Sequence, residues 1–138
     1  MPIDVRYIDE DRGVVLTIRG NVSGSEMIDA NNKVYSSKKS MQRLRYGYID
    51  LSGAEEMHVS QHEVQILAKQ SREASAIVKE KTNAIVATSD LAYGISRMWL
   101  ALVDNIGWDN AVFRSEAQAK KWLKETVHQK DGFDISLN

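Results

Sequence analysis

The chain alternates between short apolar runs and longer amphipathic segments, and this alternation predicts its secondary structure. Val5 to Ile8 and Val14 to Arg19 are rich in β-branched residues and are separated by a polar stretch that ends in Gly13. This pattern is typical of a β-hairpin with a longer loop. The chain is therefore predicted to open with two antiparallel strands.

Four segments further along carry apolar residues at the spacing of an amphipathic helix, about 3.6 residues per turn. The longest two run from Val64 to Val78 and from Leu91 to Ile106, where Gly107 follows as a stop signal. A shorter, partly apolar helix is predicted before them and another after them. Each start has a residue suited to the N-cap position, and most also carry the Glu or Gln of a capping box. The predicted starts are Ser23, Ser60, Ser89 or Asp90, and Ser115.

Three apolar runs between these helices indicate β-strands. They are Tyr46 to Leu51, followed by a predicted turn at Ser52-Gly53, then Ala84 to Ala87, and Ala111 to Phe113. The run at 84–87 has no polar alternation, which is typical of a strand covered on both faces of a parallel sheet. Strands and helices that alternate in this way are joined by right-handed crossovers. The predicted fold is α/β, with a mixed, mostly parallel sheet of about five strands, four helices and an opening β-hairpin.

The composition fits one globular domain. The chain has 138 residues, of which 43% are hydrophobic and 27% charged, so a single core over residues 1–138 is expected, with a loosely held tail at 130–138. The net charge of −1 provides no basic field for nucleic acid. The absence of cysteine excludes disulfides and thiolate chemistry, and no apolar stretch is long enough for a membrane span. A soluble, cytoplasmic protein without cofactors is expected.

Residues 48–57 resemble the central part of STAS domains, the type found in anti-sigma-factor antagonists. Their sequence is Tyr48-Ile49-Asp50-Leu51-Ser52-Gly53-Ala54-Glu55-Glu56-Met57. In that family a strand ends in an Asp-Leu-Ser-Gly-like turn before a helix, and the order of the other elements is similar. The part from Asp90 to Leu123 looks more like the SpoIIAA-like branch, some members of which are likened to lipid-binding CRAL-TRIO domains. The resemblance covers nearly the whole chain and implies a SpoIIAA-like fold and a non-enzymatic regulatory role in binding another protein.

In phosphorylatable members of the family, the helix after the turn opens with an Asp-Ser pair, and the serine accepts phosphate from a partner kinase. Counted without gaps, the Asp position falls on His58 and the phospho-acceptor position on Val59, so that Ser60 comes one residue late. Ser60 has two interpretations: a helix N-cap, or a regulatory phosphosite whose charge the helix dipole favours. The candidate partner surface is the strand-to-helix segment around 52–62. Its residues are Asp50, Ser52, Met57, His58, Ser60 and His62.

His58 and His62 are four residues apart, a spacing at which two imidazoles on a helix can share a zinc ion. However, a cap at Ser60 places His58 before the helix, and Val59 stands where a zinc protease carries its glutamate. No metal site is predicted, and both histidines are expected on an exposed loop. No nucleophile-elbow, phosphate-loop or dinucleotide-binding motif occurs, which favours a protein that is not an enzyme. An enzyme or metal protein that uses these histidines with nearby carboxylates is the third hypothesis.

The helix predicted from Leu91 carries a wide apolar stripe centred on Met98, Trp99 and Leu102. Such a stripe is usually core packing. Two alternatives remain open: these residues could line a pocket for a small apolar, lipid-like ligand, or form a homodimer interface. The main hypothesis is thus a protein-binding regulatory module. The second is a carrier or sensor of an apolar ligand, which predicts a void beneath this helix.

Overall fold

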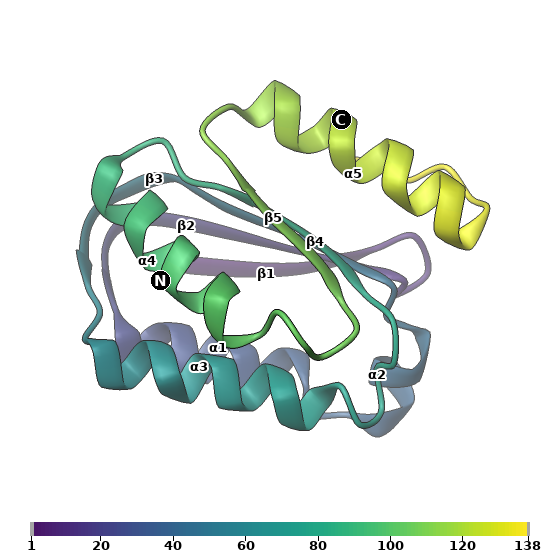
Figure 1. Ribbon diagram of the computed structural model, residues 1–138, viewed down its shortest axis with the longest axis horizontal. Helices are drawn as coiled ribbons and strands as arrows, with labels where there is room; N and C mark the ends of the chain where they lie inside the picture. Colours follow the sequence, from purple (N-terminus) through teal and green to yellow (C-terminus); the bar gives the residue numbers. More distant parts are fainter. Residues whose placement is uncertain (1, 138) are drawn as a thin grey trace.

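The predicted strands and helices are present in a computed structural model, which describes residues 2–137 of the chain (Figure 1). Those residues form five strands and five helices. In chain order the elements are β1 (Ile3–Ile8), β2 (Gly13–Ser23), α1 (Gly24–Val34), α2 (Lys38–Arg43), β3 (Tyr46–His58), α3 (Gln61–Ala74), β4 (Thr82–Val86), α4 (Asp90–Leu102), β5 (Asp109–Phe113) and α5 (Glu116–Asp131). After the opening hairpin, strands alternate with helices as the sequence predicts.

All five strands belong to one sheet, and their order across it is β1-β2-β3-β4-β5. β1 runs antiparallel to β2, with Ile3 opposite Ile18 and Ile8 opposite Gly13. The strands β2, β3, β4 and β5 run parallel to one another. The predicted mixed, mostly parallel sheet with an opening hairpin is therefore confirmed.

Helices cover both faces of the sheet: α1, α3 and α4 lie on one face, and α5 lies on the other (Figure 1). Neighbouring residues of β2 pack against helices on opposite faces of the sheet. Leu16 and Ile18 pack toward α1 and α4, whereas Val15 packs toward α5. Successive side chains of a strand point to opposite faces, so a strand covered on both faces carries an unbroken apolar run. The stripe that α5 buries against the sheet consists of Ala119, Leu123 and Val127.

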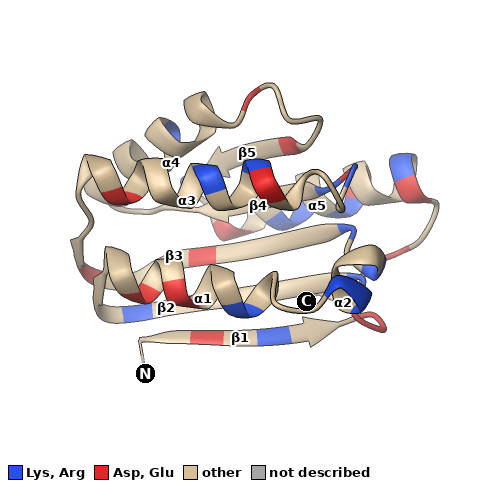
Figure 2. Cartoon of the chain, turned by 90° about the horizontal axis from the view of Figure 1, so that it is seen from below, with Lys and Arg blue, Asp and Glu red and all other residues tan. Residues whose placement is uncertain are grey.

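β1 is an edge strand with charged side chains along it. Asp4 and Arg6 are exposed, and Figure 2 shows acidic and basic positions on β1 and a group of basic residues on α2. Charges on an edge strand oppose pairing with the edge of another sheet. The opening hairpin is thus protected from aggregation through its free edge.

β3 is longer than predicted and continues past the predicted turn at Ser52-Gly53. The sequence predicts a strand that ends at Leu51, whereas β3 runs to His58. Pairing with β4 ends at Asp50, but β3 stays paired with β2 through two register shifts. A two-stranded ribbon of β2 and β3 therefore extends beyond the rest of the sheet.

Two helices end earlier than their apolar patterns predict. α3 ends at Ala74 instead of near Val78, and α4 ends at Leu102, short of Gly107. Val78 and Val103 are nevertheless buried, so the apolar spacing there reflects burial in the turns that follow the helices. The short helix α2 lies between α1 and β3, where no helix is predicted from the sequence. No helix within residues 2–137 is long and apolar enough to cross a membrane.

The C-terminal tail packs more closely than the sequence indicates. α5 is closed by Gly132, whose left-handed backbone (φ 73°) suits the end of a helix. Ile135 and Leu137 then turn back and are buried with the α5 layer of the core. The backbone N–H of Ser136 donates a 3.1 Å hydrogen bond to the carboxylate of Asp9. Residues 133–137 are therefore part of the fold, while residue 138 lies outside the described residues.

Candidate functional site

Ser60 is the N-cap of α3, and a complete capping box surrounds it. Its hydroxyl accepts a 3.1 Å hydrogen bond from the backbone N–H of Glu63, and the Glu63 carboxylate accepts one of 2.9 Å from the backbone N–H of Ser60. The hydrogen bond from the Ser60 backbone lowers the pKa of Glu63, so this carboxylate is ionised at neutral pH. The predicted cap at Ser60 is confirmed, and the residue is exposed while it caps the helix.

The start of α1 lies beside the start of α3. Ser23 caps α1 through the same reciprocal bonds with Glu26, and it is the parallel-strand neighbour of His58. A Cβ placed on Gly24 would lie 2.3 Å from the carboxyl carbon of Glu63, so the two helix starts are in contact. We call the surface they form, at the end of the β2–β3 ribbon, the helix-start surface. Its exposed or part-exposed residues are Ser23, Ser25, His58, Ser60, Gln61 and His62.

The structure separates the predicted partner residues into three environments. Asp50 and Ser52 lie where β3 parts from β4, and one carboxylate oxygen of Asp50 accepts hydrogen bonds from the Ser52 N–H (2.9 Å) and hydroxyl (2.6 Å). His58 stands six strand residues further on, about 20 Å away at the rise of an extended strand. Met57 is 8% exposed and belongs to the core, so the prediction that it faces a partner is corrected. His58, Ser60 and His62 remain together on the helix-start surface.

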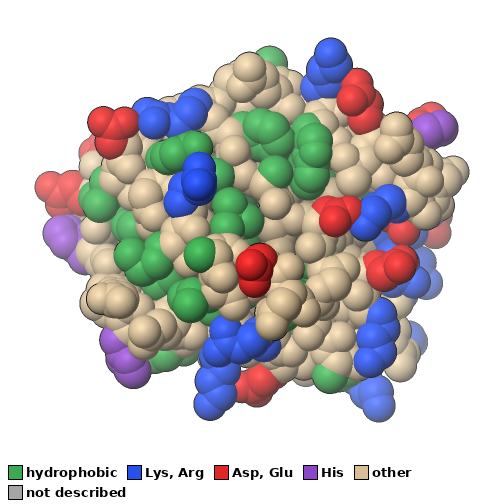
Figure 3. Space-filling model, viewed as in Figure 1, with side chains coloured by type: hydrophobic (Ala, Val, Ile, Leu, Met, Phe, Trp, Pro, Cys, Tyr) green, Lys and Arg blue, Asp and Glu red, His purple; other side chains and the backbone are tan. Residues whose placement is uncertain are grey.

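His58 and His62 are both exposed, but they belong to different elements. His58 is the last residue of β3, and its Nε2 lies 3.3 Å from a carboxylate oxygen of Glu56; His62 is in the first turn of α3. Histidine side chains project from the end of the molecule where α3 begins (Figure 3). Within residues 2–137, no group of three or more His, Cys, Asp or Glu side chains is placed to hold a metal ion. The pair therefore offers an exposed, polar surface.

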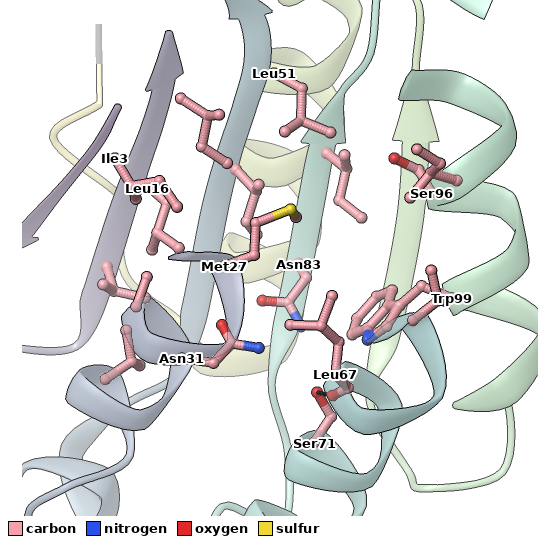
Figure 4. A pocket seen from close by; sticks show the side chains of 18 of the residues that line it. Ile3, Leu16, Met27, Asn31, Leu51, Leu67, Ser71, Asn83, Ser96 and Trp99 are labelled. Carbon is pink, nitrogen blue, oxygen red and sulfur yellow. Dashed lines mark hydrogen bonds between the residues drawn. The ribbon is translucent and has the colours of Figure 1, made fainter. Parts of the chain in front are cut away.

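A second feature is a partly open apolar cavity of about 100 Å³ between α3 and the sheet (Figure 4). Leu67 and Ser71 of α3 line one side, and Leu51 and Asn83 of the sheet line the other, with α1 and α4 closing its flanks. α3 packs mainly against α1 and α4 and makes few close backbone approaches to the sheet. Space therefore remains beneath α3, whereas the ligand-carrier hypothesis places the void beneath α4, which here only borders the cavity.

α4 contributes only part of its predicted stripe to this cavity. Trp99 lines it, together with Ile95 and Ser96. Met98 and Leu102 instead point to solvent, with 40% and 36% of their surface exposed, and apolar side chains gather over α4 in Figure 3. The prediction that Met98 and Leu102 line a pocket is therefore corrected, because α4 rests on the sheet through its opposite face.

Two polar side chains lie at the wall of the cavity near α2. Lys81 is 6% exposed, and its Nζ donates a 3.0 Å hydrogen bond to the hydroxyl of Tyr35. Asn83 is 2% exposed and points from β4 into the space beneath α3 (Figure 4). Gly47 makes room for both, because a Cβ there would lie 2.5 Å from the Asn83 amide oxygen and 3.5 Å from the Lys81 Nζ.

Burial lowers the pKa of Lys81 to about 7. Burial is the cause, since no carboxylate among the described residues lies close enough to hold the ammonium in its charged form. The aromatic rings of Tyr35 and Trp108 have their centres 5.2 and 5.0 Å from its Nζ, which offers partial cation–π compensation. At neutral pH, both the charged and the neutral form of this side chain are therefore populated.

Sequence reasoning missed this polar end of the cavity. The residues Lys81-Thr82-Asn83 directly precede the run at 84–87, which was predicted to be covered on both faces. A lysine and an asparagine at the start of such a strand indicate buried polar groups, because a strand that is covered on both faces buries every side chain. Tyr35, far away in the sequence, offers no such signal.

Comparison with known proteins identifies the fold. No family model matches the sequence, and no curated protein matches it significantly. Among solved structures, the chain is similar to the anti-sigma factor antagonist SpoIIAA in its unphosphorylated form, with a TM-score of 0.58 at 9% sequence identity. The alignment covers 95% of this chain and 99% of that one. The chain therefore has the SpoIIAA-like (STAS) fold, which confirms the predicted fold class.

Proposed function

We propose that this protein is a non-enzymatic regulatory module of the STAS type that binds a protein partner through its helix-start surface. The observation that carries the proposal is the exposed end formed by Ser23, His58, Ser60 and His62, where two capped helices and the β2–β3 ribbon meet. Polar, accessible groups on a rigid scaffold are suited to recognition. The similarity to an anti-sigma factor antagonist supports a role in protein binding.

Ser60 takes part in this proposal as a cap, in its unmodified form. A phosphate on its hydroxyl would lie beside the ionised carboxylate of Glu63, which already accepts the Ser60 backbone N–H. Like charges at that distance repel each other. Phosphorylation at Ser60 would therefore open the capping box, so partner binding is proposed to require the free hydroxyl.

The test introduces two negative charges on the helix-start surface. His58→Glu with His62→Glu leaves Ser60 and its cap intact, whereas His128→Glu places a similar change at the exposed far end of α5. Each tagged protein is isolated gently from its own source organism and measured by native mass spectrometry. A partner protein that is retained by the wild type and by His128→Glu but lost from the double variant supports the proposal. A partner retained equally by all three assigns binding to another surface.

The second candidate function, a carrier or sensor of a small apolar ligand, is favoured by the cavity beneath α3. Its wall is mostly aliphatic, and a ligand pocket typically combines such a wall with a few well-placed polar groups. Leu67→Trp would fill the space from α3. A small apolar probe, 1-butanol, is expected to raise the melting temperature of the wild type and to have no such effect on Leu67→Trp.

A further inference from the structure

The polar end of the cavity lacks the partners that its groups require. Among the described residues, no donor reaches the buried amide oxygen of Asn83, although its Nδ2 donates a 2.8 Å hydrogen bond to Asn110. Within residues 2–137, the side-chain nitrogen of Lys81 is hydrogen-bonded only to the hydroxyl of Tyr35. An ammonium has three N–H donors, so two of them have no acceptor. Buried polar groups in native proteins are nearly always satisfied.

The missing partner has a defined charge. None of the residues that line the cavity is Asp or Glu, and Lys81 forms no ion pair within the described part of the chain. A buried ammonium is costly unless an anion pairs with it. A ligand that is anionic at one end and apolar at the other therefore complements both the charge of Lys81 and the aliphatic wall.

We propose that the cavity binds a short-chain aliphatic monocarboxylate, with its carboxylate on Lys81 and its hydrocarbon chain directed toward Leu67 and Trp99. This inference rests on the second candidate function and specifies its ligand class. Size sets an upper limit on the chain length: a cavity of about 150 Å³ takes up benzene, which has as many non-hydrogen atoms as butyrate, so about 100 Å³ favours a chain of no more than about four carbon atoms. Butyrate is the probe of matching length.

A bound carboxylate would complete the hydrogen bonds of the Lys81 ammonium. The ammonium of Lys81 directs one N–H to Tyr35 at 3.0 Å, a second to the carboxylate, and a third toward the amide oxygen of Asn83. Both Nζ and that amide oxygen lie within 3.5 Å of the position that a Cβ on Gly47 would take, so they border the same small space, and the proposal places the flexible lysine with its third N–H on the amide oxygen. Every donor of the ammonium then has an acceptor.

The proposal predicts that carboxylate binding is stronger at low pH, where Lys81 is charged. The titratable group that touches Lys81 is Tyr35, whose pKa burial raises, so it stays neutral. The other described residues seen beside Lys81 are uncharged: Trp108, Gly47 and, in the lining of the same cavity, Ser71. With a pKa of about 7 in the free protein, Lys81 carries its charge at pH 6 and loses it above pH 8. Carboxylate binding is therefore expected to weaken as pH rises through 7.

The experiment compares butyrate with 1-butanol by isothermal titration calorimetry of the full chain at pH 6.0 and 8.5. Butyrate is expected to bind about 30-fold more weakly at pH 8.5, which follows from one proton with the pKa of Lys81. Butanol is expected to show no pH dependence. Lys81→Met should weaken butyrate at pH 6.0 at least tenfold and spare butanol, while the exposed control Lys69→Met leaves both unchanged.

Each outcome decides between the claims. If butanol binds and butyrate does not, the carboxylate proposal is overturned and the carrier function stands. The same holds if butyrate affinity is unchanged both by pH and by Lys81→Met. If neither probe binds, both fail. Should Lys81→Met not fold, the wild type still gives the answer, because butyrate must raise the pKa of Lys81 in an NMR titration of its Nζ. An unchanged pKa under saturating butyrate contradicts the proposal.

Discussion

The side-chain nitrogen of Lys81 lies 3.0 Å from the hydroxyl oxygen of Tyr35, and this is its only hydrogen bond to the described part of the protein. The folded-state pKa of about 7 is far below the ordinary value of 10.5. Between pH 7 and pH 10.5, the unfolded chain binds a proton at Lys81 that the folded protein does not. Stability therefore rises as pH increases from 7 toward 9.5. Below pH 7 the folded protein bears the full free-energy cost of burying the charged ammonium.

Replacement by Met is expected to remove this penalty. Because one pKa unit corresponds to about 1.4 kcal/mol, Lys81→Met should raise the free energy of unfolding at pH 6 by a few kcal/mol, with about 5 kcal/mol as the upper limit. Urea unfolding at pH 6.0, 8.0 and 9.5 measures the effect. The variant should also lose the rise in stability above pH 7. A wild-type stability that is flat over this range would show that Lys81 is charged and solvated in the folded state.

Removal of the α3 cap gives the second prediction. Ser60→Ala deletes the acceptor for the Glu63 N–H and is expected to lower the free energy of unfolding by about 1 kcal/mol. Ser60→Asn keeps an uncharged acceptor and should retain most of the stability. Gln61→Ala, at an exposed neighbouring position, serves as the control and should change little. A loss as large in Gln61→Ala as in Ser60→Ala would assign the effect to general disturbance of the loop.

The close approach of α1 and α3 gives a third prediction. Gly24→Ala places a Cβ 2.3 Å from the carboxyl carbon of Glu63, so that side chain must swing away and abandon its bond to Ser60. The expected loss is about 1 kcal/mol, the net worth of one hydrogen bond. Gly94→Ala, in the middle of α4 with open space around it, should instead stabilise by about 0.5–1 kcal/mol. Thermal unfolding of the two variants should therefore shift in opposite directions.

Asp9 links the opening loop to the C-terminal tail. Burial alone would raise its pKa, but hydrogen bonds from Tyr46 and Ser136 outweigh it and leave the pKa lowered. The stability from this group is therefore complete above the ordinary pKa of about 4 and is lost as pH falls through the lower folded value. Asp9→Asn is expected to reduce the dependence of unfolding on pH between 5 and 2, and to speed proteolysis of residues 133–137. An unchanged cleavage rate would mean that apolar burial of Ile135 and Leu137 holds the tail without Asp9.

Most of the fold could be predicted because local signals and tertiary packing agree. The apolar run of β2, the caps at Ser23 and Ser60, and the covered strand at 84–87 each point to the element that forms. The length of β3 could not be predicted, because Ser52-Gly53 carries a turn signal. In the structure Gly53 pairs with Arg19 of the neighbouring strand, and that long-range partner overrides the local preference.

The candidate sites were predicted less completely for a similar reason. Residue type and spacing located His58, Ser60 and His62 on one surface, since they are close in sequence. The cavity depends instead on α3 resting on α1 and α4, and on Gly47 leaving room near Lys81. Such a space is a product of packing between distant segments, for which a single sequence carries no periodic signal.

The order of the strands in the sheet has a consequence for how the chain folds during synthesis. Because the spatial order β1-β2-β3-β4-β5 is also the order in the chain, each new strand joins the free edge left by the one before it. No strand has to insert between two that are already paired. As the ribosome releases the chain from its N-terminus, the sheet can grow one strand at a time, and α5 with the tail closes the second face after all five strands have emerged.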